Sequence, residues 1–228
     1  IQNTKEYTFP TLCPECGATL VRIEGEAAWR CPNESGCPPQ IKGRIEHFIS
    51  RKAMNIMTLG PETIDEYFSR QLIHNIADLY TLTPMQITGG NTNRMVSAQK
   101  VVSSIRESVS VPFERVLFAL GIRMVGETTA KILARNFKSI DALMAAKVEE
   151  LTTIEGVGNT IAENVVAYFQ NSDNRDIIER LRAFGLQMSL SEQQLTLQGD
   201  ALAGKSIVIS GVFTHHSRDE YKQMIEQQ

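Results

Sequence analysis

The chain has 228 residues, of which 42% are hydrophobic and 21% charged, and its formal net charge is -3. This length is enough for one or two domains with a substantial core, and we see neither a membrane-spanning apolar run nor a secretory signal. Residues 1–140 hold 16 Lys and Arg against 13 Asp and Glu, whereas residues 141–228 hold 7 against 13. The net charge argues against a nucleic-acid partner, but the weakly basic front half suits a binder that relies on backbone amides more than on lysine stripes.

All four cysteines of the chain lie between positions 13 and 37. Cys13 and Cys16 are separated by two residues and followed by Gly17, which is typical of a metal knuckle, and Cys31 and Cys37 form a wider second pair. Four thiolates without another soft ligand nearby predict a closed, tetrahedral, structural zinc site. Two disulfides or a redox dithiol are the alternatives. Both fit less well, because nothing indicates export and because two cysteine pairs lie together.

The residues around the cysteines divide the front of the chain. Residues 1–10 show no periodicity and are interpreted as a remnant linker from a preceding domain. Residues 11–44 are predicted to form a four-cysteine zinc finger, with short strands at 20–23 and 27–30 on either side of Gly25. A segment this small has too little core to fold alone, so we expect zinc binding to be coupled to its folding.

A short glycine pattern recurs along the chain. It is fullest at residues 154–162, Ile-Glu-Gly-Val-Gly-Asn-Thr-Ile-Ala, which is typical of a Gly-x-Gly hairpin that opens a helix. Residues 124–130 repeat the second glycine and the alanine four positions after it, and residues 58–64 repeat the glycine. The repeated glycines are Gly60, Gly126 and Gly158, and the first of the two gaps is close to twice the second.

Two periods of about 33 residues fit the longer gap and place a further copy at Arg94. This copy has Thr92 and Arg94 in place of the glycines, but it keeps Ala98 where Ala130 and Ala162 stand. Four copies at nearly equal spacing, with their key positions at 60, 94, 126 and 158, predict an internal repeat.

The repeated pattern suits the binding of phosphate groups. Glycine lets the backbone turn with positive φ and approach a ligand closely, and the following helix begins with unpaired N–H groups and a positive dipole end. Such a device grips a sugar-phosphate backbone without reading bases. The alternative is that the glycines only cap and turn core helices. The candidate DNA-binding residues are Gly60, Gly126, Gly156, Gly158, Arg123, Thr128, Asn159 and Thr160.

Residues 45–188 are predicted to be helical, with a turn of helix at 76–80 and a glycine-containing connection at 81–93. Apolar residues at helical spacing predict the core. They are Ile45, Phe48, Ile49, Ala53, Ala98, Val101, Val102, Ile105, Phe113, Val116, Leu117, Leu120, Ile132, Leu133, Leu143, Met144, Leu151, Val165, Val166, Phe169, Ile177, Ile178 and Leu181.

The composition changes towards the end of the chain. Residues 189–199 are polar and are predicted to form a linker. Residues 205–213 are rich in β-formers and predict a strand, and the capping box Ser217–Glu220 predicts a helix that follows it. One strand and one helix cannot bury enough surface to stand alone, so residues 200–228 are interpreted as the start of an incomplete domain.

Three stretches together resemble the bacterial NAD-dependent DNA ligases: the Cys-Pro-Glu-Cys-Gly knuckle, residues 48–56 and residues 118–130. The resemblance implies a C-terminal, mainly α fragment with a helix-hairpin-helix domain of four hairpins at residues 45–188. A small zinc-binding β-ribbon precedes this domain, and a truncated α/β segment, the start of a BRCT domain, follows it. In that family the hairpins would grip the minor groove of double-stranded nicked DNA independently of sequence. The zinc finger would join them to a preceding oligonucleotide-binding domain.

These ligases transfer AMP from NAD to a lysine in a Lys-x-Asp-Gly motif and then to a 5′ phosphate. No such motif occurs in this chain, so the resemblance implies a fragment that is inactive alone, with NAD and Mg2+ used only by the full-length parent. The histidines at 47, 74, 215 and 216 are scattered without a nucleophile partner. A cytoplasmic monomer without membrane contact is expected.

Two other classes of protein remain open. One is a stand-alone adaptor that binds DNA through the zinc finger and the hairpins. The other is a nuclease or glycosylase built on the same hairpins, which would need a catalytic Asp or Lys beside one of them. The pairs Asn159–Thr160 and Glu127–Thr128 do not provide such a group.

Overall fold

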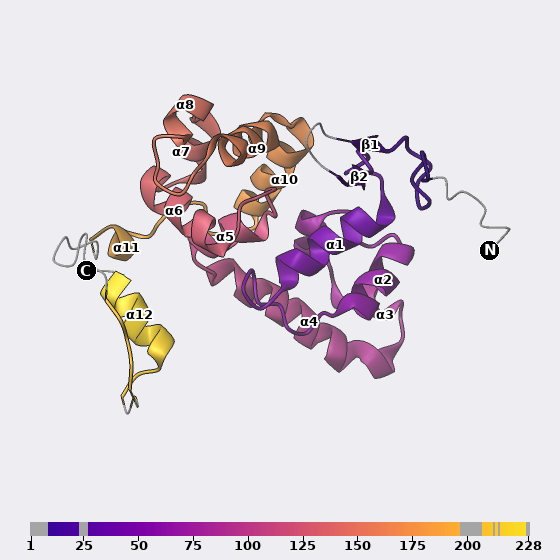
Figure 1. Ribbon diagram of the computed structural model, residues 1–228. Helices are drawn as coiled ribbons and strands as arrows, with labels where there is room; N and C mark the ends of the chain where they lie inside the picture. Colours follow the sequence, from indigo (N-terminus) through magenta and orange to yellow (C-terminus); the bar gives the residue numbers. More distant parts are fainter. Residues whose placement is uncertain (1–8, 23–26, 197–206, 212, 214, 227–228) are drawn as a thin grey trace, which may run out of the picture.

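The computed structural model describes residues 9–22, 27–196, 207–211, 213 and 215–226. A small ribbon at the front of the chain is followed by a body of helices, which confirms the mainly α fold with a zinc-binding ribbon (Figure 1). Among the described helices, none is long and apolar enough to cross a membrane.

The front ribbon contains two short antiparallel strands, β1 (Val21–Arg22) and β2 (Trp29–Arg30). Val21 lies opposite Arg30 and Arg22 opposite Trp29, and an isolated bridge joins Leu12 to Thr19. Both predicted strands are present but shorter than expected. The turn between them, with Gly25, lies outside the described residues, as do residues 1–8.

The first group of helices begins earlier than the sequence indicated. Helix α1 (Pro38–Ile49) has prolines at its first two positions, where a missing N–H costs little, so it crosses the predicted boundary between residues 44 and 45. The predicted turn of helix at 76–80 is the 3-10 helix η1 (Ile76–Thr81). The other elements of this group are α2 (Pro61–Ser69), α3 (Pro84–Thr88), η2 (Thr92–Arg94), α4 (Met95–Glu107) and η3 (Ser108–Ser110).

Helix α3 lies within residues 81–93, which the sequence indicated only as a glycine-containing connection. Thr83 and Gln86 form a capping box in which each side chain accepts from the backbone N–H of the other residue, and Pro84 occupies the first helical position. These start signals outweigh the small number of apolar residues in the segment.

The second group of helices packs beside the first group (Figure 1). They are α5 (Phe113–Ala119), α6 (Glu127–Phe137), α7 (Ile140–Ala145), α8 (Val148–Leu151), α9 (Asn159–Gln170) and α10 (Ser172–Ala183). Both groups contribute to a single cluster of buried residues that runs from Ile41 to Leu190. Every predicted core residue belongs to it or packs against it, and only Ile132, Met144, Val166 and Ile177 are partly exposed.

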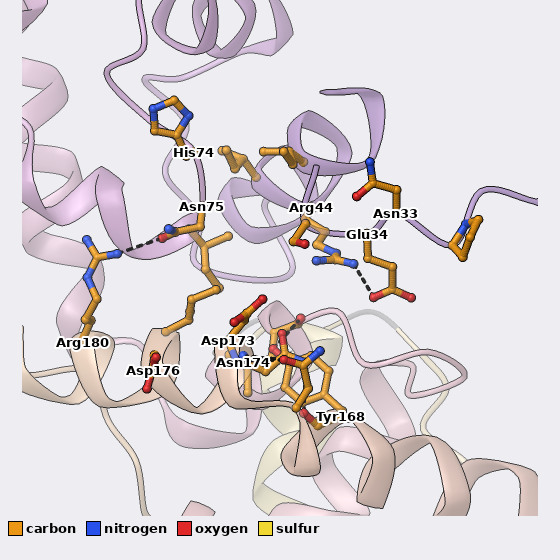
Figure 2. A pocket seen from close by; sticks show the side chains of 18 residues that line it. Asn33, Glu34, Arg44, His74, Asn75, Tyr168, Asp173, Asn174, Asp176 and Arg180 are labelled. Atoms are coloured by element: carbon orange, nitrogen blue, oxygen red, sulfur yellow. Dashed lines mark hydrogen bonds and ion pairs between the residues drawn. The ribbon is translucent and has the colours of Figure 1, made fainter. Parts of the chain in front are cut away.

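Two polar and aromatic contacts join the groups. The Arg180 guanidinium of α10 lies 2.7 Å from the Asp78 carboxylate of η1, and the rings of Tyr80 and Phe184 are stacked with their centroids 5.7 Å apart. Between α1 and η1 on one side and α9 and α10 on the other lies a cavity of about 490 Å³ (Figure 2). Its rim carries the Arg44–Glu34 ion pair of 2.6 Å and the carboxylates of Asp173 and Asp176.

The packed body extends beyond the predicted start of the linker at residue 189. Met188 and Leu190 are buried, and the Leu190 N–H donates to the Lys138 carbonyl at 2.8 Å. Met188 in turn accepts from the Ile140 N–H at 2.8 Å. The short helix α11 (Glu192–Thr196) follows.

At the end of the chain, the predicted capping box is present. The Glu220 carboxylate accepts from the Ser217 N–H at 2.6 Å, and helix α12 (Arg218–Glu226) follows. Residues 207–211 of the predicted strand have no strand assigned, because a strand requires a partner and none is assigned among the described residues. The remainder of that prediction falls mostly outside the described residues.

Candidate metal centre and nucleic-acid interface

The four cysteine sulfurs form one cluster in which every Sγ lies within 4.8 Å of the others. The Sγ atoms of Cys13 and Cys37 are 3.9 Å apart, and those of Cys16 and Cys31 are 3.4 Å apart. A tetrahedral zinc site with Zn–S bonds of about 2.3 Å has sulfur–sulfur edges of about 3.8 Å. The cluster therefore fits a structural Zn2+ ion, as the cysteine pattern predicted.

The first pair is positioned by a tight turn. The Gly17 N–H donates to the Cys13 carbonyl at 2.9 Å, and the Cys13 N–H donates to the Ala18 carbonyl at 2.8 Å. Gly17 has φ +72°, a left-handed conformation that glycine adopts without strain. This turn brings the Cys13 and Cys16 side chains to the same side of the loop.

The wide spacing of the second pair has a local cause. The Cys37 N–H donates to the Asn33 carbonyl at 3.0 Å, which closes an extra turn between the two cysteines, and Cys37 is the N-cap of α1. The Gln40 side chain of α1 donates to the Cys31 carbonyl at 3.1 Å. The additional residues thus anchor the metal site to the first helix.

The thiols differ in acidity because their surroundings differ. A backbone hydrogen bond at Ala18 lowers the pKa of Cys16 to about 7, whereas burial raises the pKa of Cys31 to about 12. Burial also raises the pKa of Cys37. A bound dication offsets the burial cost, since it binds thiolates in preference to thiols.

Each key position of the predicted repeat directly precedes an α-helix, although Arg94, unlike the three extended glycines, is right-handed helical as the last residue of η2. Gly60, Arg94, Gly126 and Gly158 are the N-caps of α2, α4, α6 and α9, respectively. The small residue four positions later is buried in three copies, as Ala98, Ala130 and Ala162. The spacing of the sequence pattern therefore reproduces the spacing of the helix starts.

The three cap glycines leave the helix N-termini without a capping side chain. Gly126 and Gly158 have φ of -82° and -81° with ψ near 180°, and Gly60 is also extended. No side-chain cap hydrogen bond forms at any of the three, and a Cβ added there would meet nothing within 4 Å. The first-turn N–H groups thus keep their capacity to bind an anion.

This geometry corrects one part of the sequence argument, because these caps do not have positive φ. The left-handed residues lie earlier in each loop. Asn55, Gly89 and Gly121, with φ of +57°, +58° and +69°, stand five residues before Gly60, Arg94 and Gly126. Gly89 and Gly121 end the helices α3 and α5, and Asn55 follows a turn after α1. The second copy has therefore kept a glycine, Gly89, at a position that the Gly-x-Gly pattern did not indicate.

The loops of the first and third hairpins share a burial pattern. In each loop two apolar residues are buried, Ile56 and Leu59 in the first and Ile122 and Val125 in the third. The two residues between them are exposed. The buried pair fixes the loop to the core, and we call the exposed pair the hairpin tip: Met57 and Thr58 in the first hairpin, and Arg123 and Met124 in the third.

The other candidate DNA-binding residues lie at or beside the helix starts. Thr128 and Thr160 are the second residues of α6 and α9, and both are exposed. Asn159 is the first residue of α9, and its side chain donates to Glu163 at 2.7 Å. Gly156 has φ +86° in the fourth loop. The structure thus places these residues beside their helix starts, within the third and fourth hairpins.

Two basic residues near the hairpins escaped the sequence analysis. Arg115 of α5 donates to the backbone carbonyls of Arg51, at 2.6 Å, and Lys52, at 3.1 Å. The Lys52 ammonium lies 3.2 Å from the Glu127 carboxylate at the start of α6. These contacts tie the first hairpin to the third, and because the two segments are distant in the sequence, no local pattern could reveal them.

His47 and His216 make contacts within the fold. The His47 Nε2 lies 2.8 Å from the Phe118 carbonyl, and its ring packs edge-on against the Phe118 ring. His216 lies 4.0 Å from Glu220, within the turn that starts α12. The contacts assigned to these two histidines involve a carbonyl, a carboxylate and aromatic rings, and none involves a nucleophilic side chain.

Comparison with known proteins gives two domain matches. Residues 13–38 match the NAD-dependent DNA ligase C4 zinc finger domain, and residues 115–178 match the helix-hairpin-helix motif. The first match covers the four-cysteine cluster, and the second covers the third and fourth hairpins.

Whole-chain relatives agree with these matches. The chain is 57% identical to a DNA ligase of Phocaeicola vulgatus over 96% of its length and 33% of the relative. It is 56% identical to a DNA ligase of Bacteroides fragilis, over 97% and 33% of the two chains, and 54% identical to one of Parabacteroides distasonis, over 96% and 33%. The chain thus spans about a third of the length of these relatives. Over that third, with its zinc finger and its hairpins, the chain belongs to the bacterial NAD-dependent DNA ligase family.

Proposed function

We propose that this chain is the non-catalytic, DNA-gripping part of an NAD-dependent DNA ligase. It holds the duplex backbone around a nick while an adenylation domain outside this sequence seals the break. The observation that carries the proposal is the set of three glycine-capped helices, α2, α6 and α9, each preceded by a tight loop and open to an anion at its first turn. The relatives, which are named DNA ligases, support the same conclusion.

The chemistry of this grip is electrostatic and independent of base sequence. A phosphate at a helix N-terminus accepts hydrogen bonds from backbone N–H groups and gains from the helix dipole. The candidate contacts are those at Gly60, Gly126, Gly156 and Gly158, with Arg123, Thr128, Asn159 and Thr160 beside them. We assign no phosphate contact to the second hairpin, because Arg94 at its cap lies 3.3 Å from the Glu66 carboxylate.

The zinc site has a separate task in this proposal. Its ligands include the N-cap of α1, so the ion fixes the ribbon to the first hairpin and prepares a rigid junction towards a preceding domain. NAD and Mg2+ act only in the complete ligase. Residues 200–228 are the start of a BRCT domain, and the protein works as a monomer in the cytoplasm, where the chromosome is.

The experiment that tests the proposal is a binding titration with nicked duplexes of two unrelated sequences at several salt concentrations. Equal affinities for both sequences are expected. We also expect a salt dependence shallower than that of a lysine-rich protein with as many contacts, because neutral amides displace fewer counterions. Failure to bind either duplex, or a strong preference for one sequence, would contradict the proposal.

A second measurement tests the division of labour. Incubation with NAD labelled in its AMP part should leave no label on this chain, and the chain alone should not seal a nick. A covalent label would show that the chain carries its own adenylation site and would contradict the non-catalytic role.

A further inference from the structure

Two exposed methionines occupy the tips of the first and third hairpins. Met57 is 66% exposed and Met124 is 61% exposed, although methionine is ordinarily a core residue. Each stands beside a polar partner in its tip, Thr58 in one case and Arg123 in the other. The two tips belong to hairpins that the Lys52–Glu127 ion pair holds together.

The backbone at Met124 is unfavourable for a methionine. Its φ is +64°, in the left-handed region that residues with a Cβ seldom adopt, and Gly156 occupies the equivalent position of the fourth hairpin with φ +86°. A glycine would hold this turn with less strain, and an exposed side chain gains no burial in return. Folding alone therefore does not explain the methionine, which points to a role in binding.

The position of Met124 defines what it can touch. It stands two residues before Gly126, the cap of α6, so its side chain lies beside the site where a phosphate would be held. In a nucleic-acid strand, the groups next to each phosphate are sugar rings. An uncharged, flexible thioether side chain suits the apolar face of a sugar better than it suits another phosphate.

We propose that Met124, with Met57 in the equivalent tip, packs against the sugars of the bound strand and favours deoxyribose over ribose. This inference rests on the proposed function and deepens it by assigning a source of selectivity. A deoxyribose C2′ carries only hydrogen and can be covered by an apolar side chain at no polar cost. A 2′-hydroxyl covered in the same way would lose its hydrogen bonds to water, which is unfavourable.

The test compares Met124→Gly with the unchanged chain in binding to a nicked DNA duplex and to the same nicked sequence with one strand made of RNA. We expect Met124→Gly to bind the DNA about fivefold more weakly, the effect of losing partial burial of one methionine. The slope of affinity against salt should not change, because no charge is removed. The thermal midpoint should stay the same or rise, since glycine relieves the left-handed strain.

The hybrid duplex gives the readout that a merely structural role would not change. Its altered helix geometry affects both proteins equally, so any change in the ratio of DNA to hybrid affinity reports the methionine itself. We expect the unchanged chain to prefer DNA about tenfold. This ratio should shrink in Met124→Gly and shrink further when Met57→Ala is added.

Met85→Ala is the matched control. Met85 is 64% exposed, like the two tip methionines, but lies in α3 and outside the hairpin tips. It should leave affinity and the DNA to hybrid ratio unchanged. Equal DNA affinities of Met124→Gly and the unchanged chain, or an unchanged ratio, would overturn this inference alone. Absence of DNA binding by the unchanged chain would overturn the proposed function and this inference together.

Discussion

Substitution of the cap glycines separates a phosphate-binding role from a role in turning the chain. At Gly126 the backbone has φ -82° and ψ 180°, which any residue can adopt, and an added Cβ meets no atom within 4 Å. Gly126→Ser should therefore fold normally. Its hydroxyl can accept the N–H of the second or third helical residue, so we expect the free energy of unfolding to rise by a few tenths of a kcal/mol.

The serine hydroxyl would accept a hydrogen bond from a first-turn backbone N–H that would otherwise donate to a phosphate. A hydrogen bond to a charged group contributes about 1.5–3 kcal/mol, so the loss of one N–H to the serine should weaken DNA binding about 30-fold. Gly126→Ala adds a Cβ but cannot cap, and alanine is a poor N-cap residue. The alanine variant should be less stable than the serine variant by about 1 kcal/mol and should weaken DNA binding less than serine does.

The assay combines urea unfolding with binding to a fluorescent nicked duplex, for both substitutions at Gly126 and at Gly158. If the glycines hold phosphates, serine gives the more stable protein and the weaker binder. If the glycines are only turns, affinity follows stability and alanine gives the weaker binder. The second result would refute the reasoning about the helix N-termini.

Three further predictions concern the framework of the site. Cys37→Ser should abolish zinc binding and shift the fluorescence of Trp29, the single tryptophan. The helical circular dichroism should be largely kept, because the core cluster begins after the cysteines. Loss of the helical signal, or zinc retained in elemental analysis, would contradict this. Asp78→Ala should lower the free energy of unfolding by about 2 kcal/mol, since this carboxylate accepts hydrogen bonds from two backbone N–H groups and pairs with Arg180. Arg180→Met removes only the ion pair and should lower it by under about 1 kcal/mol, so equal losses in urea unfolding would contradict this assignment. Burial raises the pKa of Tyr80 to about 12, so the contribution of its neutral hydroxyl to the free energy of unfolding is complete below pH 10 and is lost towards pH 12. Tyr80→Phe should therefore lose less stability between about pH 8 and 11 than the unchanged chain, and identical losses would show that the hydroxyl is exposed.

The periodic features of the protein were predictable from the sequence. The four helix starts follow from a repeat that survives the loss of the glycines at Arg94, because the helix that follows still needs its buried small residue at Ala98. The metal ligands were predictable because four cysteines within a short segment offer few alternatives. The apolar stripes gave the core because helical spacing places their residues on one face.

The unpredicted features depend on loop conformation or on distant contacts. Left-handed φ at Met124 has no composition signal, since methionine seldom adopts it, and the signal at Asn55 is weak, although asparagine is enriched in this region. The end of the packed body at Leu190 depends on its backbone hydrogen bond to Lys138, which lies far back in the sequence at the end of α6. The contact between Arg180 and Asp78 likewise joins two segments that the sequence shows only as separate charged positions.

The central claim is that backbone amides at the helix starts hold the DNA, and amide NMR of the isotope-labelled chain tests it most directly. On titration with a nicked duplex, the account predicts the largest shifts at the N–H groups of residues 127–129 and 159–161, in the first turns of α6 and α9. The first turn of α10 should stay unchanged, because the Asn171 side chain already caps it at 2.8 Å. Shifts confined to the zinc ribbon, or of equal size in α10, would contradict the account.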